Sequence, residues 1–298
     1  MPNAVITLAF DPLVRLGDRL VRIESLVLAA GVLGAILIAA RLAPLTPAGD
    51  DGASAPGGTL RADDLLFIIL AAVPGAVVGG RLGYGLLHLD YYGAHPGAIL
   101  DPGQGSLQLG LAIVGGALTG GVAARLLGEP VGRWFHVAAL PLLVGIAVGK
   151  LAMALGGSGQ GMPVNLSWAT AYLGPGPWGS LAPELPSHPA QLYEAAAAAV
   201  ILAGAVVLLA SGAFARRDGR LFLAVLAAWA FARTVIAATW RDAPVLGPLR
   251  ADQLLSLAIA GTCVAIVLAG RLPRGADSPR GSIVRRPGRE RSGSPDEL

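Results

Sequence analysis

Seven apolar runs, each close to the length that crosses a bilayer, constrain this chain more than any other feature of its sequence. A membrane-spanning helix needs roughly 20 consecutive, mostly apolar residues. Charged residues make up only 14% of the chain, whereas a soluble domain carries about 25%. We therefore predict an all-α, polytopic membrane protein. The expected spans are 25–43, 65–88, 107–127, 134–156, 190–212, 221–241 and 251–270.

The distribution of basic residues predicts the orientation of these spans, because short cytoplasmic loops carry an excess of Lys and Arg. The connections 89–106 and 157–189 contain neither, whereas the C-terminal tail contains seven arginines. We therefore expect the N-terminus outside and the C-terminus in the cytoplasm. The arginines and leucines before the first span suggest a short interfacial helix. The expected regions are an outer segment 1–24, a transmembrane domain 25–270 with an outer cap 157–189, and a disordered basic cytoplasmic tail 271–298.

Three cations, Arg81, Lys150 and Arg233, lie inside the apolar runs. Charge at that depth is costly and marks a ligand or ion path. The helical rise places all three roughly 18–24 Å from the cytoplasmic edge of the bilayer. With little acid expected nearby to neutralise them, they indicate one pocket for an anionic ligand in the outer half of the membrane. The alternative is that Arg81 and Lys150 extend to the interface as structural anchors.

Aromatic and small residues surround the first of these cations. Tyr84 and His88 follow Arg81 at i+3 and i+7, on one face of a helix. Taken alone, they are more often interfacial aromatics than catalytic groups. Glycine repeats every four residues from Gly75 to Gly83, which favours close approach of a neighbouring helix.

The segment from His188 to Glu194, with the sequence HPAQLYE, opens the fifth span. Ser187 or His188 is expected to cap the helix, and the proline suits its first turn. A helix start does not require Gln191 and Glu194, which lie three residues apart on one face. We expect both to hydrogen-bond or pair with the cations.

HPAQLYE resembles the HPxQLYE motif of the bacterial prolipoprotein diacylglyceryl transferases. The segment Gly79–Tyr84, the pair Gly115-Gly116, Arg233 and the run Asp252-Gln253-Leu254 also follow that family's order, over about residues 20–270. The resemblance implies transfer of the diacylglyceryl group from phosphatidylglycerol to the cysteine thiol of a lipobox-containing prolipoprotein signal peptide. This reaction belongs to lipoprotein maturation in the bacterial plasma (inner) membrane, with membrane lipid as a further partner.

The resemblance also implies roles for individual residues. Arg81, Lys150 and Arg233 would bind the lipid phosphate, and His188, Arg233 and His88 are the candidate catalytic residues. No metal or other cofactor is expected, and the arginine-rich tail does not predict nucleic-acid binding. The expected supporting residues are Tyr84, Gln191, Tyr193, Glu194, Gly115, Gly116, Gly157 and Gly161.

Several positions depart from the family pattern. Val114 stands where the family has a histidine, and small residues around Ala237 replace an expected carboxylate. Lys150, Met153 and Ser158 stand for Arg, Asn and Glu. Lysine keeps the charge but loses the planar fork that binds phosphate through two bonds. These departures leave two alternatives to the transferase: an anionic-lipid-binding relative that transfers to a different acceptor, or an inactive one.

Overall fold

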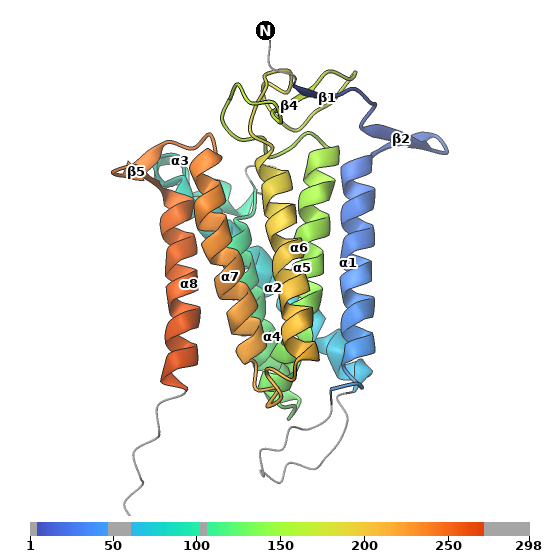
Figure 1. Ribbon diagram of the computed structural model, residues 1–298, viewed down its shortest axis with the longest axis vertical. Helices are drawn as coiled ribbons and strands as arrows, with labels where there is room; N and C mark the ends of the chain where they lie inside the picture. Colours follow the sequence, from blue (N-terminus) through green and yellow to red (C-terminus); the bar gives the residue numbers. More distant parts are fainter. Residues whose placement is uncertain (1–4, 47–60, 102–105, 271–298) are drawn as a thin grey trace, which may run out of the picture.

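Seven long helices form an upright bundle in the computed structural model, which describes residues 5–46, 61–101 and 106–270 (Figure 1). Each has the length and apolar composition to cross a membrane, so the predicted all-α, seven-span architecture is confirmed. The predicted tail 271–298 lies outside the described residues. The helices are α1 (Ile23–Leu42), α2 (Ala62–Leu87), α4 (Leu109–Leu126), α5 (Val131–Leu155), α6 (Ala190–Ala210), α7 (Arg220–Ile236) and α8 (Ala251–Ala269).

The outer surface of the bundle is apolar. Leu33, Phe67, Val200 and Phe231, from four different helices, are all more than half exposed. A surface of this kind would cause aggregation in water, but it suits contact with lipid. An α-helix pairs most of its backbone polar groups within itself, which suits a hydrocarbon environment.

The short elements gather at the end of the bundle where α1 begins, here called the cap side (Figure 1). A short 3-10 turn, η2 (Ala237–Thr239), extends α7 towards it. The others are β1 (Ile6–Leu8), β2 (Leu13–Leu16), β3 (Arg19–Arg22), α3 (Leu89–Ala94), η1 (Pro96–Leu100), β4 (Thr170–Tyr172), β5 (Pro244–Leu246) and β6 (Leu249–Arg250).

The predicted interfacial helix before the first span is wrong. Strands β2 and β3 form an antiparallel hairpin in which Leu13 pairs with Arg22 and Leu16 with Arg19. Its two-residue turn begins at Gly17, whose φ of +61° favours glycine. The alternation of leucine and arginine thus follows the two-residue period of a strand.

Residues 157–189 lie across the cap side of the bundle, above α5 and α6 (Figure 1). Strand β4 of this segment pairs in parallel with β1, with Ile6 opposite Thr170. The buried Tyr172 hydroxyl donates to the carbonyl of Ala154 near the end of α5, at 2.7 Å. Burial raises the pKa of the Tyr172 phenol, which keeps it a donor. This bond fastens the segment to the bundle.

Helices α2 and α4 pack with almost no side chain between them. A Cβ atom added at Gly75 or Gly79 would meet backbone atoms of α4, and one added at Gly115 would meet the carbonyl oxygen of Gly75. The close approach predicted from the glycine repeat is therefore confirmed. It draws these two helices together as a pair and leaves room between them and α1 and α5.

Candidate functional site

Four buried charges on four helices form one connected network. Lys150 Nζ on α5 lies 2.9 Å from Glu194 Oε1 on α6, and Arg233 Nη1 on α7 lies 2.7 Å from Glu194 Oε2. Arg233 Nε also donates to Asp252 Oδ2 on α8 at 2.9 Å. Gln108, at the start of α4, donates to the other Asp252 oxygen at 2.8 Å. Glu194 thus bridges two cations, and Arg233 bridges two carboxylates.

This network corrects the expectation that little acid lies near the cations. The pairing of Glu194 with cations, predicted from its place in HPAQLYE, is confirmed. The relative exposure is 9% for Lys150, 5% for Arg233 and 2% for Glu194. Charges so far from water require opposite charges and hydrogen bonds as partners, and each of these has both.

Two tryptophans fix the guanidinium of Arg233. Its central carbon lies 4.5 Å from the ring centroid of Trp240 and 5.5 Å from that of Trp229. Trp229 lies one helical turn before Arg233 on α7, and Trp240 follows directly after η2. Cation–π contacts and two carboxylates together hold this side chain in one orientation.

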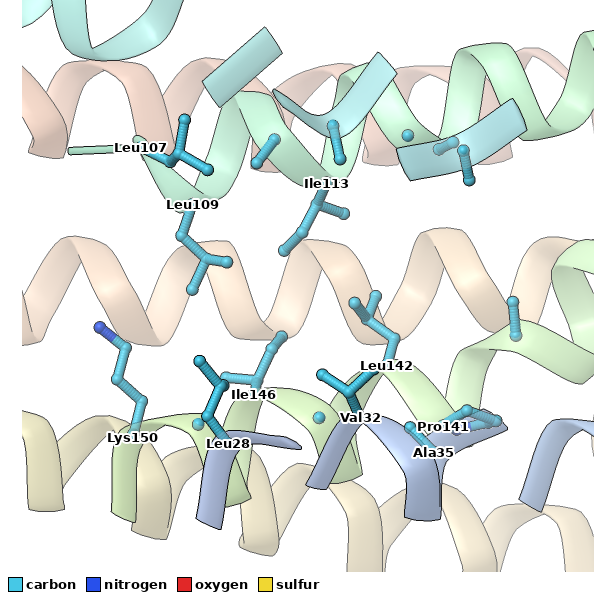
Figure 2. A pocket seen from close by; sticks show the side chains of 18 of the residues that line it. Leu28, Val32, Ala35, Leu107, Leu109, Ile113, Pro141, Leu142, Ile146 and Lys150 are labelled. Atoms are coloured by element: carbon cyan, nitrogen blue, oxygen red, sulfur yellow. The ribbon is translucent and has the colours of Figure 1, made fainter. Parts of the chain in front are cut away.

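A cavity of about 1020 Å³ lies beside the network. Its walls are apolar side chains of α1 and α5 on one side and of α2 and α4 on the other. In Figure 2, Leu28 and Val32 of α1 and Leu142 of α5 lie across an open space from Ile113 of α4. Lys150 extends from α5 into the same space. The cavity is therefore an apolar slot with charge near one end.

Polar side chains line the cap-side part of this cavity. An apolar cavity with a few convergent polar groups is the usual form of a ligand site, and this volume is at the upper end of the usual range of about 300–1,000 Å³. Its shape and polarity match an amphiphile with an anionic headgroup. The polar residues in its lining are Glu24, Tyr84, Ser106, Lys150, Gln160, Gln191, Glu194, Arg233, Arg241 and Asp242.

Arg81 makes contacts of a different kind from those of Lys150 and Arg233. Its guanidinium donates to the backbone carbonyls of Ala98, Ile99 and Asp101 at 2.8–3.1 Å. Among the described residues, Lys150 and Arg233 line the cavity and Arg81 does not. Arg81 thus ties the segment after α3 to α2.

Arg241 is the cavity's third cation, and the sequence reasoning missed it. Its Nε donates to the carbonyl of Gly161 at 2.8 Å, and its Nη2 donates to Ser187 Oγ at 3.1 Å. It follows Trp240 directly in a short polar run after the sixth span. Its place eight residues after Arg233, at the end of the same predicted span, was the available signal.

The two histidines predicted as candidate bases do not line the cavity among the residues that the structure describes. His88 follows the last residue of α2, and its ring stacks on Tyr84 with centroids 4.1 Å apart. His188 Nδ1 lies 3.3 Å from the hydroxyl of Tyr193, which also accepts from Trp168 Nε1 at 2.8 Å. Neither Ser187 nor His188 caps α6 through its side chain, so that prediction is wrong.

The other predicted supporting residues shape the site in different ways. Gln191 Nε2 donates to the Tyr172 hydroxyl at 3.1 Å, which links α6 to the cap-side segment. Gly116 lines the cavity, and Gly157 turns the chain out of α5 with a φ of +68°. Gly161 N donates to the carbonyl of His188 at 2.8 Å, and a Cβ added at Gly161 would meet the carbonyl oxygen of Thr239.

Comparison with known proteins adds to this geometry. The sequence pattern of the family described as prolipoprotein diacylglyceryl transferase matches residues 12–269. This chain belongs to that family. A phosphatidylglycerol–prolipoprotein diacylglyceryl transferase of Rhodospirillum centenum is 34% identical over 238 residues, covering 76% of this chain and 77% of that protein. An enzyme of the same name from a Nostoc species is 29% identical over 265 residues, covering 87% of each chain.

Family membership confirms the resemblance inferred from HPAQLYE, and with it a multi-pass membrane transferase of lipoprotein maturation. The structure shows where the residues that depart from the family pattern lie. Val114 packs against the apolar core, and Met153 lines the cavity. Ala237 is fully buried, and Ser158 Oγ lies 3.4 Å from a carboxylate oxygen of Glu24 on α1.

Proposed function

We propose that this protein transfers the diacylglyceryl group of phosphatidylglycerol to the cysteine thiol of a prolipoprotein lipobox. The observation that carries the proposal is the Lys150–Glu194–Arg233 network at one end of a long apolar cavity. The acyl chains would occupy the apolar slot, and the phosphate would lie beside the cations. Names of the relatives support the same pair of substrates.

The cations have donors left for a phosphate. Lys150 Nζ carries three protons, and among the described residues its one carboxylate partner within 4 Å is Glu194. Arg241 Nη1 has no partner among the described residues, and Arg241 lines the same cavity. We therefore assign phosphate binding to Lys150, Arg233 and Arg241. Arg81 binds backbone carbonyls of residues 98–101, and Ser106 and Leu107, later in the same connection, line the cavity.

The proposed reaction requires positive charge beside the leaving phosphate, and the polar end of the cavity contains cations. The acceptor thiolate attacks the glyceryl carbon that carries the phosphate ester, the carbon–oxygen bond breaks, and glycerol phosphate leaves with the electron pair. Cations placed beside the leaving phosphate stabilise the charge that develops on it. The opposing carboxylates keep Lys150 and Arg233 in place between turnovers.

We place the cap side outside the cell, in the plasma membrane of a bacterium. The absence of Lys and Arg from 89–106 and 157–189 supports this orientation. The polar end of the cavity then opens towards the outer half of the bilayer. A secreted prolipoprotein and a membrane phospholipid meet in that layer.

Purified protein in detergent, supplied with phosphatidylglycerol and a lipobox peptide, tests the proposal. The expected product is a peptide whose cysteine carries a thioether-linked diacylglyceryl group, detected by mass, with release of glycerol phosphate. A family enzyme of established activity serves as the positive control. No product from this protein, under conditions in which the control turns over, would contradict the proposed function.

A further inference from the structure

The cavity has no histidine in its described lining, yet the proposed reaction must remove a proton from a thiol. A thiol becomes a good nucleophile only as the thiolate. The acidic and phenolic side chains in the lining are Glu24, Glu194, Asp242 and Tyr84. Glu194 is bonded through both oxygens to cations, which leaves it a poor proton acceptor.

Glu24 differs from Glu194 in having an oxygen to spare. Its Oε2 accepts from Arg22 Nη2 at 2.9 Å and lies 3.4 Å from Ser158 Oγ. No described residue donates to its Oε1. The side chain is 22% exposed, against 2% for that of Glu194. One oxygen is thus held in place, and the other remains open to a donor from the cavity.

The position of Glu24 also fits a proton acceptor beside the phosphate site. It belongs to the first turn of α1 and packs against Gly156, where α5 ends, so closely that a Cβ at that glycine would overlap it. Lys150 lies six residues earlier on α5, roughly 9 Å along the helix axis by the helical rise. Glu24 therefore lies further towards the cap side than Lys150, at the end of the bundle where a peptide approaching from outside would enter.

We propose that Glu24 accepts the proton of the acceptor thiol, an inference that rests on the proposed function. The carboxylate takes the proton as the sulfur–carbon bond forms, glycerol phosphate departs with the electrons of the broken carbon–oxygen bond, and the proton later passes to water. Arg22 of the hairpin is the charged group bonded to Glu24, at 2.9 Å, and Lys150 lies on α5, the helix that ends beside it.

Two acceptor peptides can distinguish whether Glu24 removes a proton or only stabilises the structure of the site. One carries cysteine in the lipobox and the other selenocysteine, whose selenol is far more acidic and is ionised at neutral pH without a base. We expect Glu24→Gln to lower transfer to the cysteine peptide by about 100-fold or more and transfer to the selenocysteine peptide by less than about 10-fold. The remaining cysteine activity of the variant should rise with pH towards the thiol pKa of about 8.5.

Control variants make the outcome specific. Glu184→Gln changes an exposed carboxylate of the cap-side segment and should leave both rates unchanged. Asp242→Asn and Tyr84→Phe test the two other candidates in the lining. An equal loss with both peptides for Glu24→Gln, no loss with either, or the cysteine-selective loss in Asp242→Asn or Tyr84→Phe would overturn the assignment. A wild-type protein inactive on both peptides would overturn the proposed function as well.

Discussion

Glu194 lies between two cations: it is the carboxylate paired with Lys150 among the described residues, and it shares Arg233 with Asp252. Removing one partner of a buried ion pair costs about 3–5 kcal/mol, because it leaves a charge far from water without a counter-charge. Here a single change affects Lys150 and Arg233 together. The site's electrostatics therefore depend on one acidic residue of α6.

We expect Glu194→Gln to lower the thermal unfolding midpoint of the protein in detergent and to abolish transfer. The amide keeps the shape of the side chain and removes its charge. Glu184→Gln, on the exposed cap-side segment, removes the same charge without a buried partner and should leave the midpoint unchanged. Equal midpoints for the two variants would show that the network does not stabilise the fold.

Residue types and spacing predicted three of the four charges in the network. Lys150 and Arg233 were predicted as site residues because a charge inside an apolar run is costly unless it has a function. Glu194 was predicted because the start of a helix does not require a glutamate at that position. Arg81 also lies within an apolar run, but its guanidinium donates to backbone carbonyls of the connection that follows α2. The sequence does not show which way a helix turns its faces, so these bonds of Arg81 could not be predicted from its depth in the span. Glu24 was missed because it lies at the edge of a span, where a carboxylate costs little.

The contact between α2 and α4 shows how small residues position the larger elements. Gly115 lies against the backbone of Gly75, with no space for a side chain. Close backbone approach lets these helices pack without the hydrophobic effect that operates in water. The paired helices α2 and α4 also form one wall of the cavity. The glycines between them therefore help to shape the site although they lie away from the charged network.

Gly115→Ala should therefore destabilise the protein by about 1–3 kcal/mol, the usual cost of overpacking a tight contact. Gly204→Ala on α6 is the matched control, because a Cβ there meets nothing within 4 Å. Alanine suits a helix better than glycine, so the control should be neutral or slightly stabilising. Thermal unfolding of both variants measures the difference, and a Gly115→Ala midpoint at or above that of Gly204→Ala would contradict the packing.

The connection between α4 and α5 carries a pH-dependent contribution to stability. Burial and the neighbouring carboxyl of Asp64 raise the pKa of Glu129, against the opposing effect of Arg133. A carboxyl with a raised pKa in the fold stabilises the fold in its protonated form, and that stability is lost as pH rises through the folded pKa. Glu129→Gln keeps the neutral form, so it should raise the unfolding midpoint at pH 7.

The same comparison at a pH below the ordinary glutamate pKa of about 4.3 completes the test. There both proteins carry an uncharged side chain at position 129, and their midpoints should converge. A Glu129→Gln protein no more stable than wild type at pH 7 would show that the carboxyl is not penalised in the fold.

Helix spans were predictable because bilayer thickness fixes their length, whereas the short elements at the cap side were not. The hairpin β2–β3 was assigned to a helix, although Gly17-Asp18 between alternating residues is a two-residue turn signal. The expectation of an amphipathic interfacial segment outweighed that signal. Strand β4 pairs with β1 across more than 160 residues, with Ile6 opposite Thr170, and no local pattern indicates such a partner.

At the scale of the whole molecule, the cavity joins the charged network to the hydrocarbon layer. Its apolar walls come mainly from α1, α2, α4 and α5, with Phe222 from α7, and its polar end contains residues from six of the seven spans or their flanks. Individual apolar residues in the sequence did not reveal it, because a cavity depends on which faces remain unpaired after packing. The close pairing of α2 with α4 leaves their other faces to line the cavity.

Ala35→Phe tests whether the apolar part of the cavity holds a substrate. Ala35 lines the slot from α1 (Figure 2), and a phenyl ring would occupy space assigned to acyl chains. We expect the KM for phosphatidylglycerol to rise about 10-fold or more, equivalent to about 1.4 kcal/mol of lost binding. Ala199→Phe, at an exposed position on α6, is the matched control and should leave KM unchanged. Equal KM values for both variants would place the acyl chains elsewhere.

Complementation tests the central claim most directly, namely that this divergent site still matures lipoproteins. The gene is expressed in a bacterium depleted of its own prolipoprotein diacylglyceryl transferase, beside a Lys150→Met variant that removes a network cation. We predict that the wild-type protein restores growth and diacylglyceryl-modified lipoproteins, and that Lys150→Met does not. Failure of the wild-type protein to restore either, while it is present in the membrane at the level of a working family enzyme, would contradict the account.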